Sequence, residues 1–287
     1  YPESASVRGG TLVNVSGFGF GFGSRPRCRF GIVGTTAATV LGESAMLCHT
    51  PLATTATLES VPLEVSLNAQ QFTRDAQAFH LHAHPHVSGV SPDRGPMDGG
   101  THVHVVGANF DGGTWGRYAC RFGELLVPAT FVNRSMLTCA APVGGALQTG
   151  TRCVEVTLNG QDYTDGCAQF TSAPMGALAS LSPTSGPILG GTRLSLTGMR
   201  LAGGSDYRCK FVPPGGLAEG GEATHEHLQA FFAEVLQVRA TLDGAAGVGV
   251  TCETPPVGLL PAVHSVSVTS NGQQYTNPVA FEAFAHP

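Results

Sequence analysis

Residues 91–110 read SPDRGPMDGGTHVHVVGANF, and the same arrangement of residues occurs twice more in the chain. The other copies are YPESASVRGGTLVNVSGFGF from Tyr1 and SPTSGPILGGTRLSLTGMRL from Ser182. The Gly-Gly-Thr triplets are 90 and then 91 residues apart, beginning at Gly9, Gly99 and Gly190. Self-similarity at a fixed period is the signature of repeated modules. The chain is therefore predicted to consist of three copies of one unit.

Later landmarks recur in the same order within each copy. A Cys-x-Phe step begins at Cys28, Cys120 and Cys209, and a Cys-x-x-Pro step begins at Cys48, Cys139 and Cys252. Each copy closes with a strand, a turn and a strand: VPLEVSLNAQQFTRDAQAF, CVEVTLNGQDYTDGCAQF and HSVSVTSNGQQYTNPVAF. The third copy carries an insertion at about residues 212–237. There THEHLQAFFAEVLQ places apolar residues from Leu228 to Leu236 at helical spacing, which predicts a short amphipathic helix; an extended β-excursion is the competing interpretation.

The segments between these landmarks are short and alternate between apolar and polar residues. In THVHVVG, Val103 and Val105 face one way and the intervening histidines the other, which is the pattern of a half-buried strand. Asn-Gly pairs at positions 159 and 271 are strong hairpin signals. About 90 residues of short strands with frequent turns fit a β-sandwich.

Each copy resembles an IPT/TIG domain, the immunoglobulin-like sandwich of plexins, hepatocyte growth factor receptor, fibrocystin and some transcription factors. The resemblance lies in the SP…GP…GGT opening, the Gly-x-x-Phe/Leu after the next strand, the two cysteine steps and the final NG…Y…F. It covers essentially the whole chain. It implies an all-β protein of three tandem immunoglobulin-like sandwiches, at residues 1–83, 84–173 and 174–287. The first copy has Tyr1-Pro2 in place of Ser-Pro and is expected to lack its first strand.

The eight cysteines are distributed as the repeat requires. Each copy has one cysteine in each of the two steps, so the economical disulfides are Cys28–Cys48, Cys120–Cys139 and Cys209–Cys252. The remaining pair, Cys153 and Cys167, lies at equal distances from Gly160 and is set face to face by its hairpin. Closing loops of about 20 residues stabilises a module by roughly 3 kcal/mol.

Disulfides and sequons both indicate export. Four disulfides imply an oxidising compartment, and no Cys-x-x-Cys spacing is present to ligate zinc. Acceptor sequences for N-glycosylation occur at Asn14, on the outward face of its predicted strand, and at Asn133, near a loop. We therefore expect an extracellular or cell-surface glycoprotein.

Composition excludes several classes of protein. Charged residues make up 12% of the chain, the net charge is −5 and Lys210 is the only lysine, so the basic footprint of a nucleic-acid partner is missing. No run of 18 apolar residues is available to span a membrane, and no signal peptide is recognisable. The motifs of serine hydrolases, zinc proteases and calcium loops are absent and the acidic residues are scattered singly, so we expect neither an enzyme nor a cofactor.

The stretch GFGFGFGS at residues 17–24 contains the first aromatic candidates. It lacks the Gly-Lys-Ser/Thr of a P-loop, and Phe20 aligns with core positions of the other copies. Phe18 and Phe22 are candidate contact residues, although isolated surface aromatics usually carry no function. Trp115 and Tyr118 form a second candidate pair that either contacts protein or sugar or folds back over the edge of the sandwich.

Histidines form the one cluster with ligand chemistry. His80 and His82 share one face of a predicted strand, and His102 and His104 repeat the spacing. Imidazoles at i and i+2 can share a metal ion, which makes these residues weak metal candidates. The related segment FEAFAHP from Phe281 keeps the pattern without those histidines, which favours solvated strand faces instead.

These features favour a non-enzymatic structural or adhesive rod within a larger cell-surface or filament-forming protein. Its partners would be proteins, either copies of itself or other subunits of an extracellular assembly. A ligand-binding receptor ectodomain of the plexin type and an accessory carbohydrate-binding module are the alternatives, since fold alone does not choose among them. From the way the first copy begins and the last ends, we expect further repeats on both sides in the parent chain.

Overall fold

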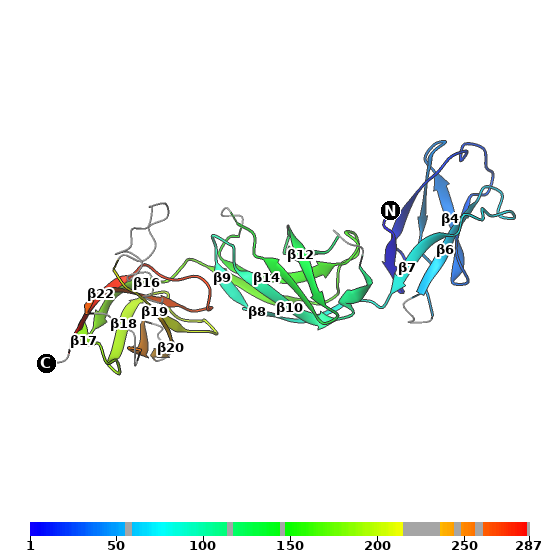
Figure 1. Cartoon of the computed structure of the whole chain (residues 1–287). Coiled ribbons are helices and arrows are strands. Elements are labelled where there is room, and N and C mark those ends of the chain that lie inside the picture. The colour runs from blue at the N-terminus through cyan, green and yellow to red at the C-terminus, as the bar shows by residue number, and fades with distance from the viewer. Residues whose placement is uncertain are drawn as a thin grey trace, which may run out of the picture. The chain divides into compact units, whose positions relative to one another are not determined.

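The computed structural model describes residues 1–54, 59–113, 117–143, 147–214, 236–243, 248–255 and 261–285. Within these residues the chain folds into three β-sheets, one for each copy of the repeat, so the predicted fold class is confirmed (Figure 1). The helix expected in the insertion lies outside the described residues, apart from Leu236 and Gln237, which belong to a strand. None of the described elements is a helix long and apolar enough to cross a membrane.

The first module contains seven strands, in the order β1-β7-β6-β3-β4-β5-β2 across its sheet. They are β1 (Ser4–Ser6), β2 (Leu12–Ser16), β3 (Arg27–Phe30), β4 (Gly34–Val40), β5 (Ala45–His49), β6 (Glu59–Ser66) and β7 (Gln77–His82). The short β1 runs parallel to β7, whereas the pairs β2–β5, β3–β4, β3–β6, β4–β5 and β6–β7 are antiparallel.

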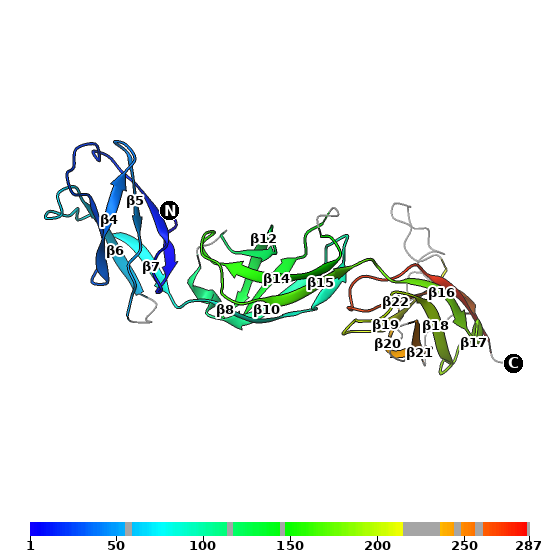
Figure 2. The ribbon, with the colours of Figure 1, turned by 180° about the vertical axis from the view of Figure 1, so that it is seen from behind.

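The second module repeats this arrangement and adds one strand, β8, beside β10. Its elements are β8 (His86–Ser91), β9 (Arg94–Pro96), β10 (His102–Ala108), the 3-10 helix η1 (Phe110–Gly112), β11 (Ala119–Phe122), β12 (Leu125–Asn133), β13 (Met136–Ala140), β14 (Gly150–Thr157) and β15 (Ala168–Ala173). The alternation that predicted β10 is observed, because Val103 and Val105 are buried and His102 and His104 are exposed. Strands β14 and β15 lie side by side, as the view from behind shows (Figure 2).

The third module has the same eight-stranded order. Its strands are β16 (Ala177–Ser182), β17 (Ser185–Pro187), β18 (Arg193–Met199), β19 (Arg208–Val212), β20 (Leu236–Asp243), β21 (Gly249–Glu253), β22 (Ala262–Thr269) and β23 (Val279–Phe284). Here β17 pairs in parallel with β23, as β1 pairs with β7 in the first module.

One strand of each module joins the two layers of the sandwich. Residues 34–37 of β4 pair with β3, while residues 38–40 pair with β5. The disulfide Cys28–Cys48 then connects β3 to β5 across the core. The disulfides Cys120–Cys139, Cys209–Cys252 and Cys153–Cys167 are also formed, so all four pairs expected from the repeat are joined and no cysteine is free.

Each core is centred on two phenylalanines that occupy repeated positions. The phenylalanine of the Cys-x-Phe step packs edge to face on one from the last strand, with ring centroids 5.1 Å apart for Phe30 and Phe79. The corresponding separations are 5.3 Å for Phe122 and Phe170 and 6.4 Å for Phe211 and Phe281. Such aromatic pairs add to the hydrophobic stabilisation that burial provides.

The chain divides into two compact units whose boundary does not follow the repeat. Tyr1–Asp93, His102–Ala146 and Thr151–Thr171 form one unit. Arg94–Thr101, Leu147–Gly150 and Ser172–Pro287 form the other. Residues 94–101 of the second module therefore group with the third module.

Candidate interaction surfaces

A hairpin with the same internal hydrogen bonds occurs once in each module, and we call it the Asn hairpin (residues 68–71, 159–162 and 271–274). In the second module, Asn159 Oδ1 accepts hydrogen bonds from the N–H groups of Gln161 and Asp162, both at 2.9 Å. Asn159 Nδ2 donates to Asp162 Oδ2 at 2.8 Å. The asparagine side chain thus closes the turn and fixes its own orientation.

A second recurring segment runs from the short parallel strand to the threonine of the Gly-Gly-Thr triplet. We call it the Thr segment (residues 4–11, 94–101 and 185–192). Its strand lies at the edge of a sheet, as β1 does beside β7. Edge strands carry backbone groups that are free to pair with another element.

In the first compact unit, the Asn hairpin of the second module lies on the Thr segment of the first, and we call this contact the first joint. Asn159 Nδ2 donates to the carbonyl oxygen of Ser4 at 3.2 Å. The Thr11 hydroxyl donates to Asp162 Oδ2 at 2.5 Å. Both Thr11 and Asn159 have an exposed fraction of 1%. This contact therefore removes polar groups of both partners from solvent while it satisfies them.

Further polar contacts surround the first joint. The Tyr1 hydroxyl donates to the carbonyl oxygen of Asn159 at 3.0 Å, and Gln161 Nε2 donates to that of Leu12 at 3.0 Å. Asn109 Nδ2 donates to the carbonyl oxygen of His84 at 3.0 Å. An ion pair between Arg8 and Asp165 lies at the exposed rim.

Within the second compact unit, the same two bonds recur between the Thr segment of the second module and the Asn hairpin of the third. Asn271 Nδ2 donates to the carbonyl oxygen of Arg94 at 3.4 Å, and the Thr101 hydroxyl donates to Gln274 Oε1 at 3.0 Å. Thr101 has an exposed fraction of 0% and Asn271 of 7%. We call this contact the second joint. The repeat has therefore preserved a pair of interacting surfaces as well as a fold.

A glycine provides the closest approach in each joint. A Cβ atom on Gly112 would lie 2.0 Å from Cβ of His82 in the first joint. A Cβ atom on Gly203 would lie 2.0 Å from Nη1 of Arg94 in the second. These glycines align with Phe22 of the first module, five residues after the shared Gly17. The first module thus has a large side chain, that of Phe22, at the position where the modules in the two joints have glycine.

Two histidines, His82 and His84, lie within the first joint. The solvated location expected for His82 is wrong, because the loop at Gly112 covers it and leaves an exposed fraction of 3%. Its Nδ1 lies 2.9 Å from the Ala83 carbonyl oxygen. Burial lowers the pKa of His82, opposed by that carbonyl and by Asp162 and Asp111.

His84 is the second histidine of the joint. Its Nδ1 lies 3.2 Å from the Ser6 hydroxyl and its Nε2 lies 3.5 Å from Asp165. Burial and the neighbouring charge of Arg8 lower the pKa of His84, while Asp165 and Asp162 oppose the shift.

The other histidines of the predicted metal candidates differ from His82 in their exposure. His80, His102 and His104 are exposed, and His104 Nδ1 lies 3.4 Å from the Thr138 hydroxyl. In the part of the chain that the structure describes, no three histidine, cysteine or acidic side chains are grouped as metal ligands.

Phe18 and Phe22 stand out from the first module into solvent, with exposed fractions of 97% and 88%. Phe20, between them, is 6% exposed and belongs to the core. The three phenylalanines line a surface hollow of about 510 Å³ that is also lined by Asn68 and Gln71 of the Asn hairpin and by Phe72. Two exposed aromatic rings beside a hollow are suited to contact with another molecule.

Tyr118 serves a structural purpose within the second module. Its hydroxyl donates to the carbonyl oxygen of Phe110 at 2.8 Å and accepts from the N–H of Gly113 at 3.0 Å. Tyr207 makes the corresponding bonds to Leu201 and Gly204. Burial raises the pKa of Tyr118. Trp115 lies outside the described residues.

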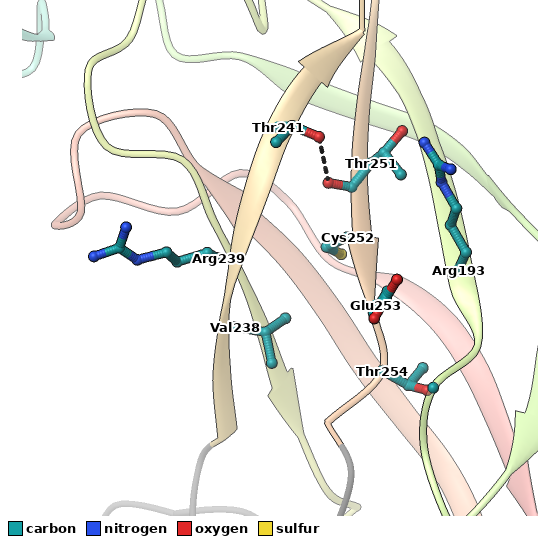
Figure 3. A pocket seen from close by; sticks show the side chains of 9 residues that line it. Arg193, Val238, Arg239, Thr241, Thr251, Cys252, Glu253 and Thr254 are labelled. Atoms are coloured by element: carbon teal, nitrogen blue, oxygen red, sulfur yellow. Dashed lines mark hydrogen bonds between the residues drawn. The ribbon is translucent and has the colours of Figure 1, made fainter.

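A further hollow, of about 450 Å³, lies over β18, β20 and β21 of the third module (Figure 3). The side chains of Arg193 and Arg239 stand on opposite sides of it; that of Arg239 points outward, and that of Arg193 runs along its strand beside Thr251. Between them the Thr241 hydroxyl donates to the Thr251 carbonyl oxygen at 3.4 Å. The Thr251 hydroxyl, which lines the hollow, donates a hydrogen bond to the Asp243 carboxylate.

The two sequon asparagines are exposed, Asn14 on β2 and Asn133 at the end of β12. At the second, Asn133 Oδ1 accepts hydrogen bonds from the N–H and the hydroxyl of Ser135, both at 2.9 Å. Use of either sequon stays a prediction.

Comparison with known proteins identifies the repeat. The model of the IPT/TIG domain matches residues 1–81, 85–172 and 178–283. Human fibrocystin-L is 26% identical over 203 residues, which cover 69% of this chain and 4% of fibrocystin-L. Plexin-A3 of Rattus norvegicus is 30% identical over 148 residues, which cover 45% of this chain and 8% of plexin-A3.

A solved structure has the same fold. The extracellular region of plexin A4 matches 95% of this chain and 22% of its own, with a TM-score of 0.52 and 15% identity. The chain thus spans only a small part of the length of all these relatives. It belongs, over nearly its whole length, to the IPT/TIG domain family.

Proposed function

We propose that the chain is a non-enzymatic part of an extracellular or cell-surface protein, in which tandem modules form a structural or adhesive rod that contacts other proteins. The observation that carries this proposal is the repetition of the joint. Two buried hydrogen bonds of the same kind hold successive modules together at both junctions. A chain that served only to tether a domain would gain nothing from such contacts, because a flexible linker is sufficient for tethering.

The disulfides support the location. Four disulfides are typical of proteins that fold in the secretory pathway or are displayed outside the cell. The relatives agree with it, since the solved plexin A4 chain is described as an extracellular region. Exposure of Asn14 and Asn133 is compatible with their glycosylation.

The contact surface that we assign to this function is the aromatic face of the first module, formed by Phe18, Phe22 and the Asn hairpin at Asn68. Phe18 and Phe22 line the same surface hollow, and exposed apolar side chains that gather in one place mark interaction sites more often than single ones do. Rings of this kind are the side chains that most often anchor protein interfaces.

Cross-linking of the native protein in its own surroundings, followed by mass spectrometry, tests the proposal. We expect links to a fixed set of structural chains or to further copies, originating near the aromatic face and lost in the F18A/F22A variant. T39A is the matched control, because Thr39 is exposed on β4. Links dominated by one soluble protein ligand would instead establish the plexin-type receptor function. Binding of oligosaccharides that F18A/F22A abolishes would establish the carbohydrate-binding alternative.

A further inference from the structure

A small cleft lies within the second joint, and we call it the joint cleft. It has a volume of about 60 Å³, and its lining includes Arg94, residues 173–176, Arg200, Asn271 and Gln274. All of its lining residues belong to the second compact unit. Space of about 10–15 Å³ is enough for one water molecule, so the cleft has room for a group of several atoms.

Smaller side chains than those of the first joint line this cleft. Ala173 and Met175 stand at the positions that His82 and His84 occupy in the first joint. His82 is 3% exposed there, so its imidazole ring is packed within the joint. Because alanine has only a methyl group in place of that ring, the second joint retains space beside its hydrogen bonds.

Arg94 brings a positive charge to the joint cleft. It is half-buried, and its Nη1 lies against Gly203. Its Nε is buried and has no hydrogen-bond acceptor among the described residues, and none of the ion pairs within that part of the chain involves Arg94. Charges that lose contact with water are normally paired, because an unpaired one is costly. The structure thus leaves this guanidinium without a partner from the chain.

The lining of the cleft contains a second cation and no acid. Arg200 lines it together with Arg94, and no aspartate or glutamate is among the described residues of the lining. Asp98, the acidic residue of the same Thr segment, is exposed and lies outside the lining. A concave site with charge of one sign attracts ions of the other sign.

The first joint has its own carboxylates at the corresponding positions. Asp162 accepts a hydrogen bond across that joint, and Asp165 forms an ion pair at its rim. They align with the neutral residues Gln274 and Asn277 of the third module. The second joint has therefore lost both negative charges, whereas it has gained the positive charge of Arg94.

Gln274 adds a hydrogen-bond donor to the lining. Its Oε1 accepts hydrogen bonds from the Thr101 hydroxyl and from Asn271 Nδ2. The Nε2 of the same amide is left for an acceptor other than these two groups. A guanidinium presents parallel N–H groups that match two oxygens of one anion. The donors of the cleft are therefore suited to an anion with several oxygens.

We propose that the joint cleft binds a small oxyanion of the sulfate or phosphate type, held by the guanidinium of Arg94 and the side-chain amide of Gln274, with Arg200 nearby. The anion supplies the negative charge that Asp162 and Asp165 supply in the first joint. It links the Thr segment of the second module to the Asn hairpin of the third and so stabilises the second joint. This site is independent of the partner proteins proposed above.

Titration of the full chain with sodium sulfate tests the proposal. The resonances to follow in ¹H–¹⁵N spectra are those of the Gln274 side-chain amide and the Arg94 Nε–H. Sodium chloride keeps the ionic strength constant, so a site that took any anion would respond little to sulfate. We expect both resonances to shift and to saturate, with a dissociation constant on the order of 1 mM, and phosphate to act in the same way.

Two substitutions remove the site in different ways. R94Q removes the guanidinium, whereas Q274E places a carboxylate in the cleft and keeps an acceptor for Thr101 and Asn271. Each should weaken sulfate binding at least about tenfold, as followed through the resonance that remains. R193Q is the control, because Arg193 is exposed on β18 and its loss changes the net charge by the same amount. We expect R193Q to bind sulfate as the wild type does.

Shifts in the wild type that do not saturate would overturn the inference, as would equal affinities of R94Q, Q274E and the wild type. Binding weakened as much in R193Q as in R94Q would assign the effect to net charge and would also overturn it. Since Q274E keeps the hydrogen-bond acceptors of the joint, loss of binding in that variant cannot be attributed to an opened joint. None of these results would affect cross-linking to other proteins in the native surroundings, which tests the proposed function separately.

Discussion

The first and second joints share two hydrogen bonds but differ in what surrounds them. In the first, the Thr11 hydroxyl meets the carboxylate of Asp162, and His82, His84, Arg8 and Asp165 lie nearby. In the second, the Thr101 hydroxyl meets the neutral amide of Gln274. The positions of His82 and His84 are occupied there by Ala173 and Met175. The shared pair of hydrogen bonds therefore defines where the surfaces meet. The surrounding residues determine the stability of each joint and how that stability depends on pH.

We expect a side chain at position 112 to weaken the first joint more than the other substitutions do, because it would force the two surfaces of the joint apart. In G112A the new methyl group would overlap Cβ of His82, which cannot move without its strand. Overpacking of this kind costs about 1–3 kcal/mol. We expect the first two modules to tumble more independently in ¹⁵N relaxation measurements. H82G in the G112A background should restore the wild-type behaviour, and unchanged relaxation in G112A would show that Gly112 does not limit the approach.

The hairpin asparagine can be removed from a hairpin inside a joint, at Asn159, and from an exposed hairpin, at Asn68. N159A loses the internal bonds of the turn and the bond to the Ser4 carbonyl, whereas N68A loses only the internal bonds. The difference between the two variants isolates the joint, and we expect N159A to be the more destabilising by about 1 kcal/mol. Urea unfolding followed through resolved methyl resonances of each module measures both. Equal losses would mean that the bond to Ser4 contributes nothing.

The Thr11 hydroxyl donates to a charged acceptor, Asp162, whereas the Thr101 hydroxyl donates to a neutral one, Gln274. Hydrogen bonds to charged groups contribute about 1.5–3 kcal/mol, against about 0.5–1.5 kcal/mol for neutral pairs. T11V should therefore weaken its joint more than T101V does, with a difference of about 1 kcal/mol. Valine keeps the shape of threonine, so packing is matched in both variants. The same urea experiment decides, and a larger loss in T101V would contradict the assigned order.

The fold was predictable because its determinants are local and repeated. The Gly-Gly-Thr triplets, the cysteine steps and the Asn-Gly pairs each constrain a turn or strand, and their three ordered copies predict three sandwiches of one kind. Phe20 was recognised as a core residue by its alignment with Phe110 and Leu201, and all three are buried.

The joints were not predicted, because their partners lie about 150 or more residues apart, as Thr11 and Asp162 do. A signal was nevertheless present. The threonine of the triplet and the asparagine of the hairpin recur in all three copies, yet both were interpreted only as features of turns. The burial of His82 was missed because the covering residue, Gly112, belongs to the next module.

Acid should loosen the first joint and leave the second unchanged, with an effect smaller than those of the substitutions. The pKa values of His82 and His84 are lowered from 6.5 by burial in the closed joint. In an open joint, solvent would return both pKa values towards 6.5, so the open form would bind protons more readily. The closed joint is thus fully favoured above about pH 6.5 and loses stability as the pH falls below it.

The side-chain amide resonances of Asn159 and Asn271 report the two joints in one sample. The intrinsic exchange rate of an amide falls between pH 7.5 and 5.5. We expect the exchange rate of the Asn159 side-chain amide to fall less than the intrinsic rate, because the first joint opens in acid. The rate of the Asn271 amide should follow the intrinsic rate. H82Q/H84Q removes the titrating groups and leaves Arg8, Asp111, Asp162 and Asp165 in place, so it should abolish the difference. A pH response that persists in that variant would assign it to the carboxylates. An equal response at Asn271 would show that the histidines do not distinguish the joints, because Ala173 and Met175 cannot titrate.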